Sequence, residues 1–356
     1  MAGVSIGIVG GGLIGLASAW RLAQAGFQVT VYERAWFGKE ASWAGAGMLA
    51  PGGEIEEASE FASLAVASRG LYSDFVRELE QTAGIQIDYQ ECGALDLAYS
   101  AEEWRALEAR AEQQRALSIP SKRIEAKQVT TFWPRVRTEG LFGALFYPGD
   151  AIVNPRDVVA ALLEACRNAS VELLPERSVE RVQILGNEAI VETKGDRRRF
   201  RAVVVAAGAW SNSIPIVGVP GLPLVEPIKG HLIGYQQPEQ TCNTIIRHGH
   251  TYLLQRANGL LIAGASVERT GWDRSIDPNI SRNLAEKAGF VLPHLTETTP
   301  SQVWIGFRPG SEALRVGSWH SDALYLAYGH FRNGILLAPQ TAADLTASLV
   351  AALGHD

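Results

Sequence analysis

The residues with the clearest chemical meaning are three glycines near the amino terminus. Gly10, Gly12 and Gly15 have the spacing G-x-G-x-x-G, with Leu13 and Ile14 between the last two. The first glycine permits a tight turn, the second lets the backbone approach a pyrophosphate, and the third lets a helix pack closely on a strand. Unpaired N–H groups at the start of that helix favour phosphate. This spacing predicts a dinucleotide site.

An acidic residue follows the glycine motif at the distance where a ribose would lie. Glu33, next to Arg34, stands about 20 residues further on, where a carboxylate accepts hydrogen bonds from ribose hydroxyls. It disfavours NADP, because it would repel the 2′-phosphate. It does not separate NAD from FAD, and a glycine-rich turn without a ligand is the alternative to both.

Three further segments rich in small residues are suited to close contact between the backbone and a large flat ligand. Ser42–Pro51 is mostly small residues, Val203–Ser211 is a hydrophobic run ending in small residues, and Gly329–Pro339 places glycines before a helix. The start of that helix could face the flavin edge at which negative charge develops on reduction. Without a ligand, Ser42–Pro51 would be a flexible loop, Val203–Ser211 an ordinary buried strand and Gly329–Pro339 the start of a capped helix. The candidate cofactor-binding residues here are Ser42, Ala46, Gly47, Met48, Leu49, Ala207, Gly208, Trp210, His330, Arg332, Asn333, Gly334, Ile335 and Leu336.

The hydrophobic pattern predicts the elements that must hold these residues. Val4–Val9 has the length of a buried strand, Leu13–Ala25 has the pattern of a helix closed by Gly26, and Gln28–Tyr32 is a second strand. Together they form a strand-helix-strand unit of about 30 residues. Further helices are expected at 59–83, 101–116, after Asn154-Pro155 and at 334–352, and further strands at 85–98, 142–152, 179–182, 189–193, 202–206 and 323–327.

From residue 224 to 266 the pattern changes to short strands separated by turns. The runs 230–235, 251–254 and 260–265 predict an antiparallel sheet inserted between segments of the nucleotide domain. We therefore expect an α/β protein with a two-domain, α+β arrangement. A Rossmann-like nucleotide-binding domain is interleaved with an antiparallel-sheet substrate domain. The nucleotide-binding segments are expected at 1–87, 146–223 and 301–356, and the substrate segments at 88–145 and 224–300.

Composition argues against several other classes of protein. The net charge is -6 and the pI about 5.7, which disfavours a nucleic-acid partner and a membrane surface. By our reading, no stretch reaches the roughly 18 apolar residues of a membrane span. Cys92, Cys166 and Cys242 are far apart and odd in number, so we expect inert thiols in a reducing cytoplasm. No Ser-His-Asp grouping or metal-ligand spacing stands out, and His248 and His250 are expected to be exposed at a strand end.

Taken together, the chain resembles the D-amino-acid-oxidase-like flavoproteins, and among them the glycine oxidases of bacterial thiamine biosynthesis. The resemblance extends along residues 7–349, and Ser42–Pro51 and Gly329–Pro339 carry it most specifically. It implies non-covalent FAD, with the adenosine part near Glu33–Arg34 and the backbone of Val179, and the flavin near the small-residue segments. It also implies a homo-oligomer, possibly a tetramer.

The same resemblance implies a substrate site. Arg308 matches the arginine that grips the substrate carboxylate, Tyr252 matches a substrate-binding tyrosine, and Arg332 adds positive charge. A planar guanidinium binds a carboxylate bidentately. For Arg308, Tyr252 and Arg332 alike, the alternative is a purely structural role. Two departures bear on the substrate: the loop Ser311–Gly317 is short and proline-free, and Val267 stands where the family can have a bulkier methionine.

The activity implied is FAD-dependent oxidative deamination of glycine or another small primary or secondary amino acid. A hydride passes from the substrate Cα to flavin N5, the imine hydrolyses to a 2-oxo acid and ammonia, and O₂ is reduced to hydrogen peroxide. The alternatives are a sarcosine oxidase, a D-amino-acid oxidase or dehydrogenase, a non-catalytic flavin-binding subunit and an NAD-linked dehydrogenase. No cysteine lies beyond Cys242, which disfavours covalent flavin near the carboxyl terminus.

Overall fold

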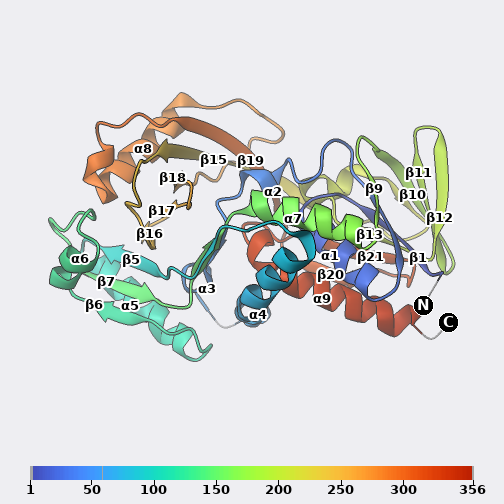
Figure 1. The fold of residues 1–356 in the computed structure, drawn as a ribbon, viewed down its shortest axis with the longest axis horizontal. Coiled ribbons are helices and arrows are strands. Elements are labelled where there is room, and N and C mark those ends of the chain that lie inside the picture. The colour runs from blue at the N-terminus through green and yellow to red at the C-terminus, as the bar shows by residue number, and fades with distance from the viewer. Residues whose placement is uncertain (1–2, 58, 355–356) are drawn as a thin grey trace.

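The structure is a computed structural model that describes residues 3–57 and 59–354 and contains a central six-stranded sheet (Figure 1). Its strands are β1 (Ser5–Val9), β2 (Gln28–Tyr32), β9 (Glu172–Leu174), β13 (Ala202–Val205), β20 (Arg315–Ser318) and β21 (Leu324–Tyr328). They lie in the order β20-β21-β13-β1-β2-β9. β20 runs antiparallel to β21, and the other neighbours are parallel. The predicted parallel sheet is confirmed.

Helices cover one face of this sheet and a second sheet covers the other. The helices are α1 (Leu13–Gln24), α4 (Glu60–Ala83), α7 (Pro155–Asn168) and α9 (Gly334–Leu353). The second sheet, in the order β12-β11-β10-β14, consists of β10 (Val179–Leu185), β11 (Glu188–Thr193), β12 (Asp196–Phe200) and β14 (Ile216–Val217). β13 shows the alternation: Ala202 and Val204 join the helix-side core, whereas Val203 and Val205 join the core beneath the second sheet.

The helix ends follow the local signals in the sequence. Ser59 accepts a hydrogen bond from the N–H of Ala62 at the start of α4, and Gly84 ends that helix with φ of 67°. Asn154 caps α7 in the same way, with Pro155 at its first position. The predicted helices at 59–83 and after Asn154 are therefore confirmed together with their capping residues.

The other large part of the molecule is an eight-stranded sheet. Its strands are β5 (Ala94–Ala98), β6 (Lys122–Ile124), β7 (Gly143–Tyr147), β15 (Glu226–Gln236), β16 (Ile245–His248), β17 (Thr251–Gln255), β18 (Leu260–Gly264) and β19 (Gln302–Gly310). The order is β19-β15-β18-β17-β16-β5-β7-β6, and β16 pairs parallel with β5 while the other pairs are antiparallel. The predicted antiparallel sheet is thus present and is wider than the pattern from 224 to 266 indicated.

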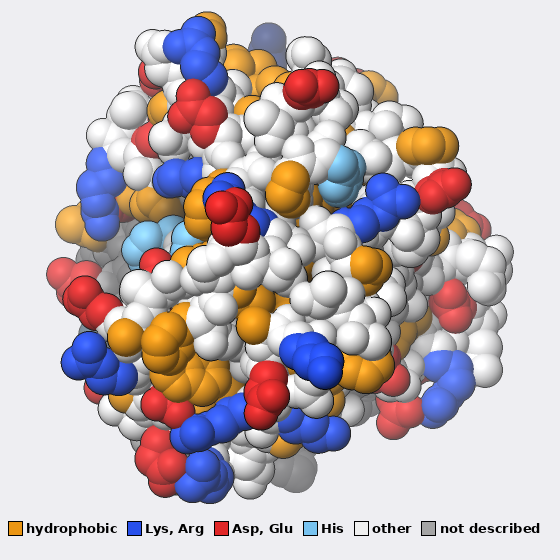
Figure 2. Space-filling model, turned by 90° about the vertical axis from the view of Figure 1, so that its left-hand side faces the viewer, with side chains coloured by type: hydrophobic (Ala, Val, Ile, Leu, Met, Phe, Trp, Pro, Cys, Tyr) orange, Lys and Arg blue, Asp and Glu red, His pale blue; other side chains and the backbone are white. Residues whose placement is uncertain are grey.

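The helices not yet named connect or cover these sheets. They are α2 (Ala41–Ala44), α3 (Pro51–Glu54), α5 (Ala101–Arg115), α6 (Ala126–Phe132), α8 (Pro278–Val291), η1 (Gly208–Ser213) and η2 (Pro293–Leu295). α6 and α8 pack on one face of the eight-stranded sheet around Val129, Leu284 and Ile246. Figure 2 views the molecule from this end, where basic, acidic and hydrophobic side chains are interspersed.

Two predicted strands are each divided in the structure. The run 85–98 forms β4 (Tyr89–Gln90) and β5, because Gly93 turns the chain with φ of 67°. The run 142–152 forms β7 and β8 (Ala151–Val153), separated by a turn that contains Gly149. β4, β8 and β3 (Met48–Leu49) make a small three-stranded sheet. The single long strands were wrong, since each run serves two different sheets.

The strand pairing also bears on the domain boundaries. β19 pairs with β15 along its length, so it belongs to the eight-stranded sheet. We propose that the last nucleotide-binding segment begins after Gly310 rather than at residue 301. β7 likewise crosses the boundary at 145/146, and we propose that this boundary lies after Tyr147.

The carboxyl-terminal helix corrects one reading of the sequence. α9 is long and apolar enough to cross a membrane by length and composition, although we expected no stretch of that kind. In the structure it packs against α1 and α4, and Leu337, Leu345 and Leu349 are fully buried. Its hydrophobicity is that of a helix in the protein core.

Candidate active site

A cavity of about 620 Å³ lies between the six-stranded and the eight-stranded sheets. Its volume is in the range of about 300–1,000 Å³ that is usual for ligand sites. One end is lined by the glycine motif, Glu33 and Val179, and the other by Tyr252 and Arg308. The structure therefore brings together the two groups of residues that the sequence placed far apart.

The glycine motif has the local geometry that its spacing predicts. Gly10 has φ of 114°, and a Cβ atom there would lie 2.5 Å from the carbonyl oxygen of Ala206. A Cβ atom at Gly15 would overlap the carbonyl oxygen of Gly10. Glu33 accepts hydrogen bonds from the N–H groups of Gly11 at 2.9 Å and Ala35 at 3.0 Å. This fixes its carboxylate and leaves acceptor positions for ribose hydroxyls.

Gly12 is a glycine that protein packing does not explain. Its φ of -77° and ψ of -176° are accessible to any residue, and a Cβ atom there would meet only the Ser42 hydroxyl oxygen, at 3.3 Å. Gly12 lines the cavity. A ligand lying directly against the backbone would account for the missing side chain.

Two helices begin at the cavity wall. Neither Gly12 before α1 nor Asn333 before α9 caps its helix with a side chain. Ser42 accepts a hydrogen bond from the N–H of Leu13 at 2.9 Å, which ties α1 to the second small-residue segment. Helix starts carry partial positive charge, so the cavity is suited to a ligand with anionic groups.

The outer rim near Arg34 is built from aromatic and charged side chains. The Arg34 guanidinium lies 3.9 Å from the centre of the Trp210 ring, and Trp272 stacks on Trp210 with ring centres 4.5 Å apart. Arg34 and Arg274 both form ion pairs with Glu40, at 2.7 and 2.8 Å. These contacts hold the segment that follows β18 against the nucleotide-binding part.

At the opposite end, the backbone of β15 makes room for Arg308. A Cβ atom at Gly230 would lie 2.5 Å from Nη2 and 2.6 Å from Cζ of Arg308, so the guanidinium lies directly against this glycine. Arg308 donates a hydrogen bond to the carbonyl oxygen of Ser266 at 3.0 Å. Burial lowers its pKa, although neighbouring Tyr252 partly opposes that shift. A guanidinium taken out of water and held in a fixed plane is ready to bind a carboxylate.

Tyr252 lies on β17, opposite Gly264 in the sheet. A Cβ atom at Gly264 would lie 2.6 Å from the Tyr252 hydroxyl oxygen, so this glycine also clears space for a neighbour. Burial raises the pKa of Tyr252 to about 12, with the positive charge of Arg308 opposing the shift. The phenol therefore keeps its proton and can donate a hydrogen bond to a bound anion.

The segment before α9 supplies the remaining predicted residues. Arg332 forms an ion pair with Glu54 at 3.2 Å, and both line the cavity. His330 is buried, and its Nε2 lies 3.0 Å from the hydroxyl oxygen of Thr341. Burial lowers the pKa of His330 to about 3, so its ring is neutral at physiological pH. A structural role fits this histidine better than proton transfer.

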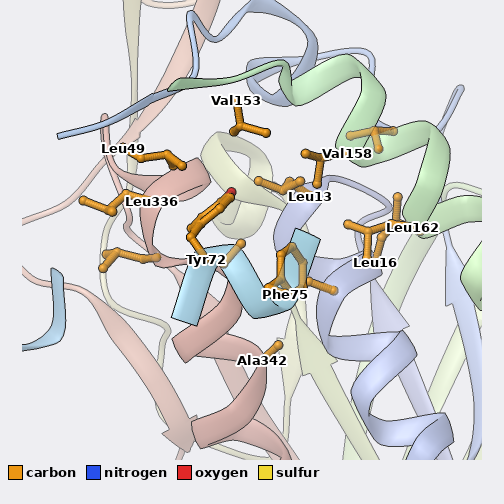
Figure 3. Packing of buried hydrophobic residues seen from close by; sticks show 14 of the residues in the cluster. Leu13, Leu16, Leu49, Tyr72, Phe75, Val153, Val158, Leu162, Leu336 and Ala342 are labelled. Carbon is orange, nitrogen blue, oxygen red and sulfur yellow. The ribbon is translucent and has the colours of Figure 1, made fainter. Parts of the chain in front are cut away.

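Three predicted cofactor-binding residues lie outside the cavity wall, namely Gly15, Leu49 and Leu336. Leu49 and Leu336 are fully buried and pack with Tyr72 in the helix-side core (Figure 3). Gly15 packs α1 onto the strand that precedes it. The other predicted cofactor and substrate residues line the cavity.

Residues that the sequence reasoning missed support this site. Arg256 is buried and donates hydrogen bonds to the carbonyl oxygens of Val153, at 2.5 Å, and Ala46, which holds the second small-residue segment in place. Nothing in the local sequence marks Arg256, because its partners are distant in the chain. Gly230, by contrast, stands inside a strand, where a glycine indicates close approach of another group.

Comparison with known proteins agrees with this arrangement. A family model described as FAD dependent oxidoreductase, DAO, matches residues 5–349. Glycine oxidase of Geobacillus kaustophilus is 31% identical over 341 residues, which cover 94% of this chain and 90% of that protein. The bifunctional protein ThiO/ThiG of Synechocystis is 33% identical over 347 residues, which cover 94% of this chain and 50% of that longer protein.

Solved structures show the same fold. The crystal structure of glycine oxidase from Geobacillus kaustophilus superposes with a TM-score of 0.91 at 28% identity and covers 97% of this chain and 94% of that one. The glycine oxidase structure from Bacillus cereus has a TM-score of 0.90 at 25% identity and covers 99% and 96%. With its glycine motif, its cavity between two sheets and this match along nearly its whole length, the chain belongs to the DAO family of FAD-dependent oxidoreductases.

Proposed function

We propose that this protein oxidises glycine, or another small primary or secondary amino acid, in the service of thiamine thiazole biosynthesis. The observation that carries the proposal is the Arg308 guanidinium, which lies against Gly230 at the end of the FAD cavity. A buried, fixed guanidinium beside a redox cofactor suits a small substrate with a carboxylate. The names of the relatives in both comparisons support the same substrate class.

The residues present fit FAD. Glu33 and Val179 would hold the adenosine part, the start of α1 the pyrophosphate, and Gly47–Met48 with Asn333–Ile335 the flavin. When bound, FAD would supply the redox chemistry, namely acceptance of a hydride from the substrate Cα and reduction of O₂ to hydrogen peroxide. The start of α9 would place a partial positive charge beside a flavin held by these residues and so favour negative charge there.

The protein contributes binding and orientation. Arg308 would grip the substrate carboxylate through two parallel hydrogen bonds, and the Tyr252 hydroxyl, protonated by virtue of its raised pKa, would donate a third. Gly230 and Gly264 leave the space that these two side chains occupy. The substrate ammonium group releases a proton to water before the hydride leaves Cα, and the imine that forms hydrolyses to a 2-oxo acid and ammonia, so the chain needs no acid or base of its own for these steps.

A second amino-acid oxidase activity is the main alternative. Val267 lines the cavity and is 57% exposed, so the wall at this position is open and could admit an N-methyl group or a short side chain. Sarcosine or a D-amino acid would then be accepted as well. A non-catalytic flavin-binding subunit would bind FAD and stay oxidised with every amino acid offered.

Two further properties complete the proposal. We propose a homo-oligomer, by analogy with the family, and a location in the cytoplasm. In the part of the chain that the structure describes, Cys92, Cys166 and Cys242 are free thiols, and burial raises the pKa of each. Protonated, partly or fully buried thiols are compatible with a reducing compartment.

An anaerobic titration of the purified flavoprotein tests the function. Glycine, sarcosine and D-alanine are added separately, and the visible flavin absorbance is followed. Bleaching by glycine, with peroxide released on admission of air, supports an oxidase, whereas bleaching without rapid reoxidation indicates a dehydrogenase. Arg308→Ala should retain FAD and lose most of its response to glycine. A variant that binds FAD and responds as the parent does would rule out Arg308 as the carboxylate ligand.

A further inference from the structure

We infer that Glu54 binds the ammonium group of the amino-acid substrate, so that Glu54 and Arg308 together recognise a zwitterion. The inference rests on the proposed function, and it assigns a role to a residue that the sequence did not single out. It also explains how the cavity would distinguish an amino acid from a simple carboxylic acid. The carboxylate of either would bind Arg308, and only the amino acid would also satisfy Glu54.

Glu54 occupies the right place in the cavity. It is the last residue of α3, it lines the cavity, and its side chain is only 13% exposed. Its charge acts at the substrate end: after burial, it adds to the rise in the pKa of Tyr252, and it opposes the lowering of the pKa of Arg308 that burial causes. Two arginines and one carboxylate therefore meet at the end of the cavity where a substrate would bind.

The carboxylate of Glu54 has an unfilled acceptor. Its Oε2 atom has no access to the cavity and pairs with Arg332, whereas its Oε1 atom is partly accessible and, within residues 3–57 and 59–354, accepts no hydrogen bond. The 3.2 Å approach of the Arg332 Nη2 is an ion pair whose angles do not make a hydrogen bond. A carboxylate oxygen at the cavity wall can accept hydrogen bonds from a ligand, and an ammonium group supplies three donors. The free acceptor and the charge both suit that ligand.

The backbone around Glu54 is fixed in advance. The side chain of Gln114, which is fully buried, donates hydrogen bonds to the carbonyl oxygens of Gly52 at 2.9 Å and Ile55 at 2.6 Å. Asp150 accepts a hydrogen bond from the N–H of Gly52 at 3.1 Å. Glu54 thus stands between two anchored residues, so little ordering would be required when a substrate binds.

The opposite charges also predict how ligands are selected. Acetate has the carboxylate that Arg308 would bind and lacks the ammonium group. The negative charge of Glu54 repels acetate, so its removal should strengthen acetate binding. Glycine would lose a charge-assisted hydrogen bond at the same time, so its binding should weaken. A change in overall structure would shift both ligands in the same direction.

The test compares Glu54→Gln with the parent holoenzyme. The dissociation constant of glycine is taken from the concentration dependence of anaerobic flavin reduction, and that of acetate from perturbation of the flavin spectrum. Glu56→Gln is the matched control, because Glu56 also lines the cavity, is exposed, and lies two residues away. We expect Glu54→Gln to weaken glycine binding about tenfold or more and to tighten acetate binding. Glu56→Gln should change neither by more than about twofold.

Two results would overturn the inference. One is an equal weakening of glycine and acetate by Glu54→Gln, and the other is the same opposed shift in Glu56→Gln. If Glu54→Gln does not retain FAD, Glu54→Asp keeps the charge with a shorter reach, and it should preserve the preference for glycine over acetate. A parent enzyme that binds acetate but is reduced by no amino acid would refute the proposed function itself, which is a distinguishable outcome.

Discussion

The glycine beneath the carboxylate-binding arginine offers the sharpest perturbation of this site. In Gly230→Ala, the new methyl group would begin 2.5 Å from Nη2 of Arg308, whereas ordinary contacts of a Cβ atom start at about 3.4 Å. The guanidinium must therefore move by roughly 0.9 Å, since it ends a flexible side chain and the strand backbone is fixed. A displacement of about 1 Å in a reacting geometry lowers rates by around a hundredfold. That corresponds to about 2.7 kcal/mol of lost transition-state stabilisation.

Gly230 is in an extended strand with an ordinary φ, so alanine fits the backbone there. FAD content and thermal stability should remain close to the parent, while kcat/KM for glycine falls about a hundredfold. The matched control is Gly70→Ala, in the helix α4, where a Cβ atom would meet nothing within 4 Å. It should raise stability by up to about 1 kcal/mol and leave kcat/KM unchanged. If Gly230→Ala keeps kcat/KM within about threefold of the parent, Arg308 does not hold the substrate as we describe.

Three other perturbations test the framework around the site. Gly15→Ala would drive a methyl group into the carbonyl oxygen of Gly10, so we expect lower thermal stability and weak FAD retention in a thermal-shift assay. Arg247→Met would leave buried Asp150 without its cation and Asp96 with Arg110 alone, and urea unfolding should show a loss of about 3–5 kcal/mol. Because burial lowers the pKa of His330 from 6.5 to about 3, the unfolded chain binds its proton first as the pH falls. The unfolding free energy should therefore decline below pH 6.5, by up to about 1.4 kcal/mol per pH unit, and His330→Gln should flatten that slope.

Local sequence signals were sufficient for the nucleotide-binding elements. The glycine spacing specifies a strand, a turn and a helix within some twenty residues, and the contact of Gly15 with Gly10 is short in sequence, although Gly10 also meets the distant Ala206. The caps Ser59 and Asn154 likewise act within their own helices. For such elements the local sequence pattern is enough to predict the local structure.

The substrate end depends on contacts between distant segments, and the sequence alone indicates it poorly. Family resemblance identified Arg308, but nothing in the residues around Glu54 shows that its carboxylate is buried opposite Arg332. Gly230 did carry a signal, since an isolated glycine within a strand indicates a close neighbour. Gly93 also indicated a break in its strand. Because apolar residues lie on both sides of it, the run 85–98 was nevertheless interpreted as one strand, and the turn at Gly93 was missed.

The order of the strands determines how much of the chain must be synthesised before the protein can bind FAD. β21 lies inside the central sheet, next to β13, and α9 begins at the cavity wall, yet both come from the last part of the chain. A ribosome that has not yet released residues 324–353 holds a nascent chain whose flavin pocket lacks a wall. Cofactor capture must therefore await the synthesis of β21 and α9, and a stop codon anywhere before α9 would yield a colourless product.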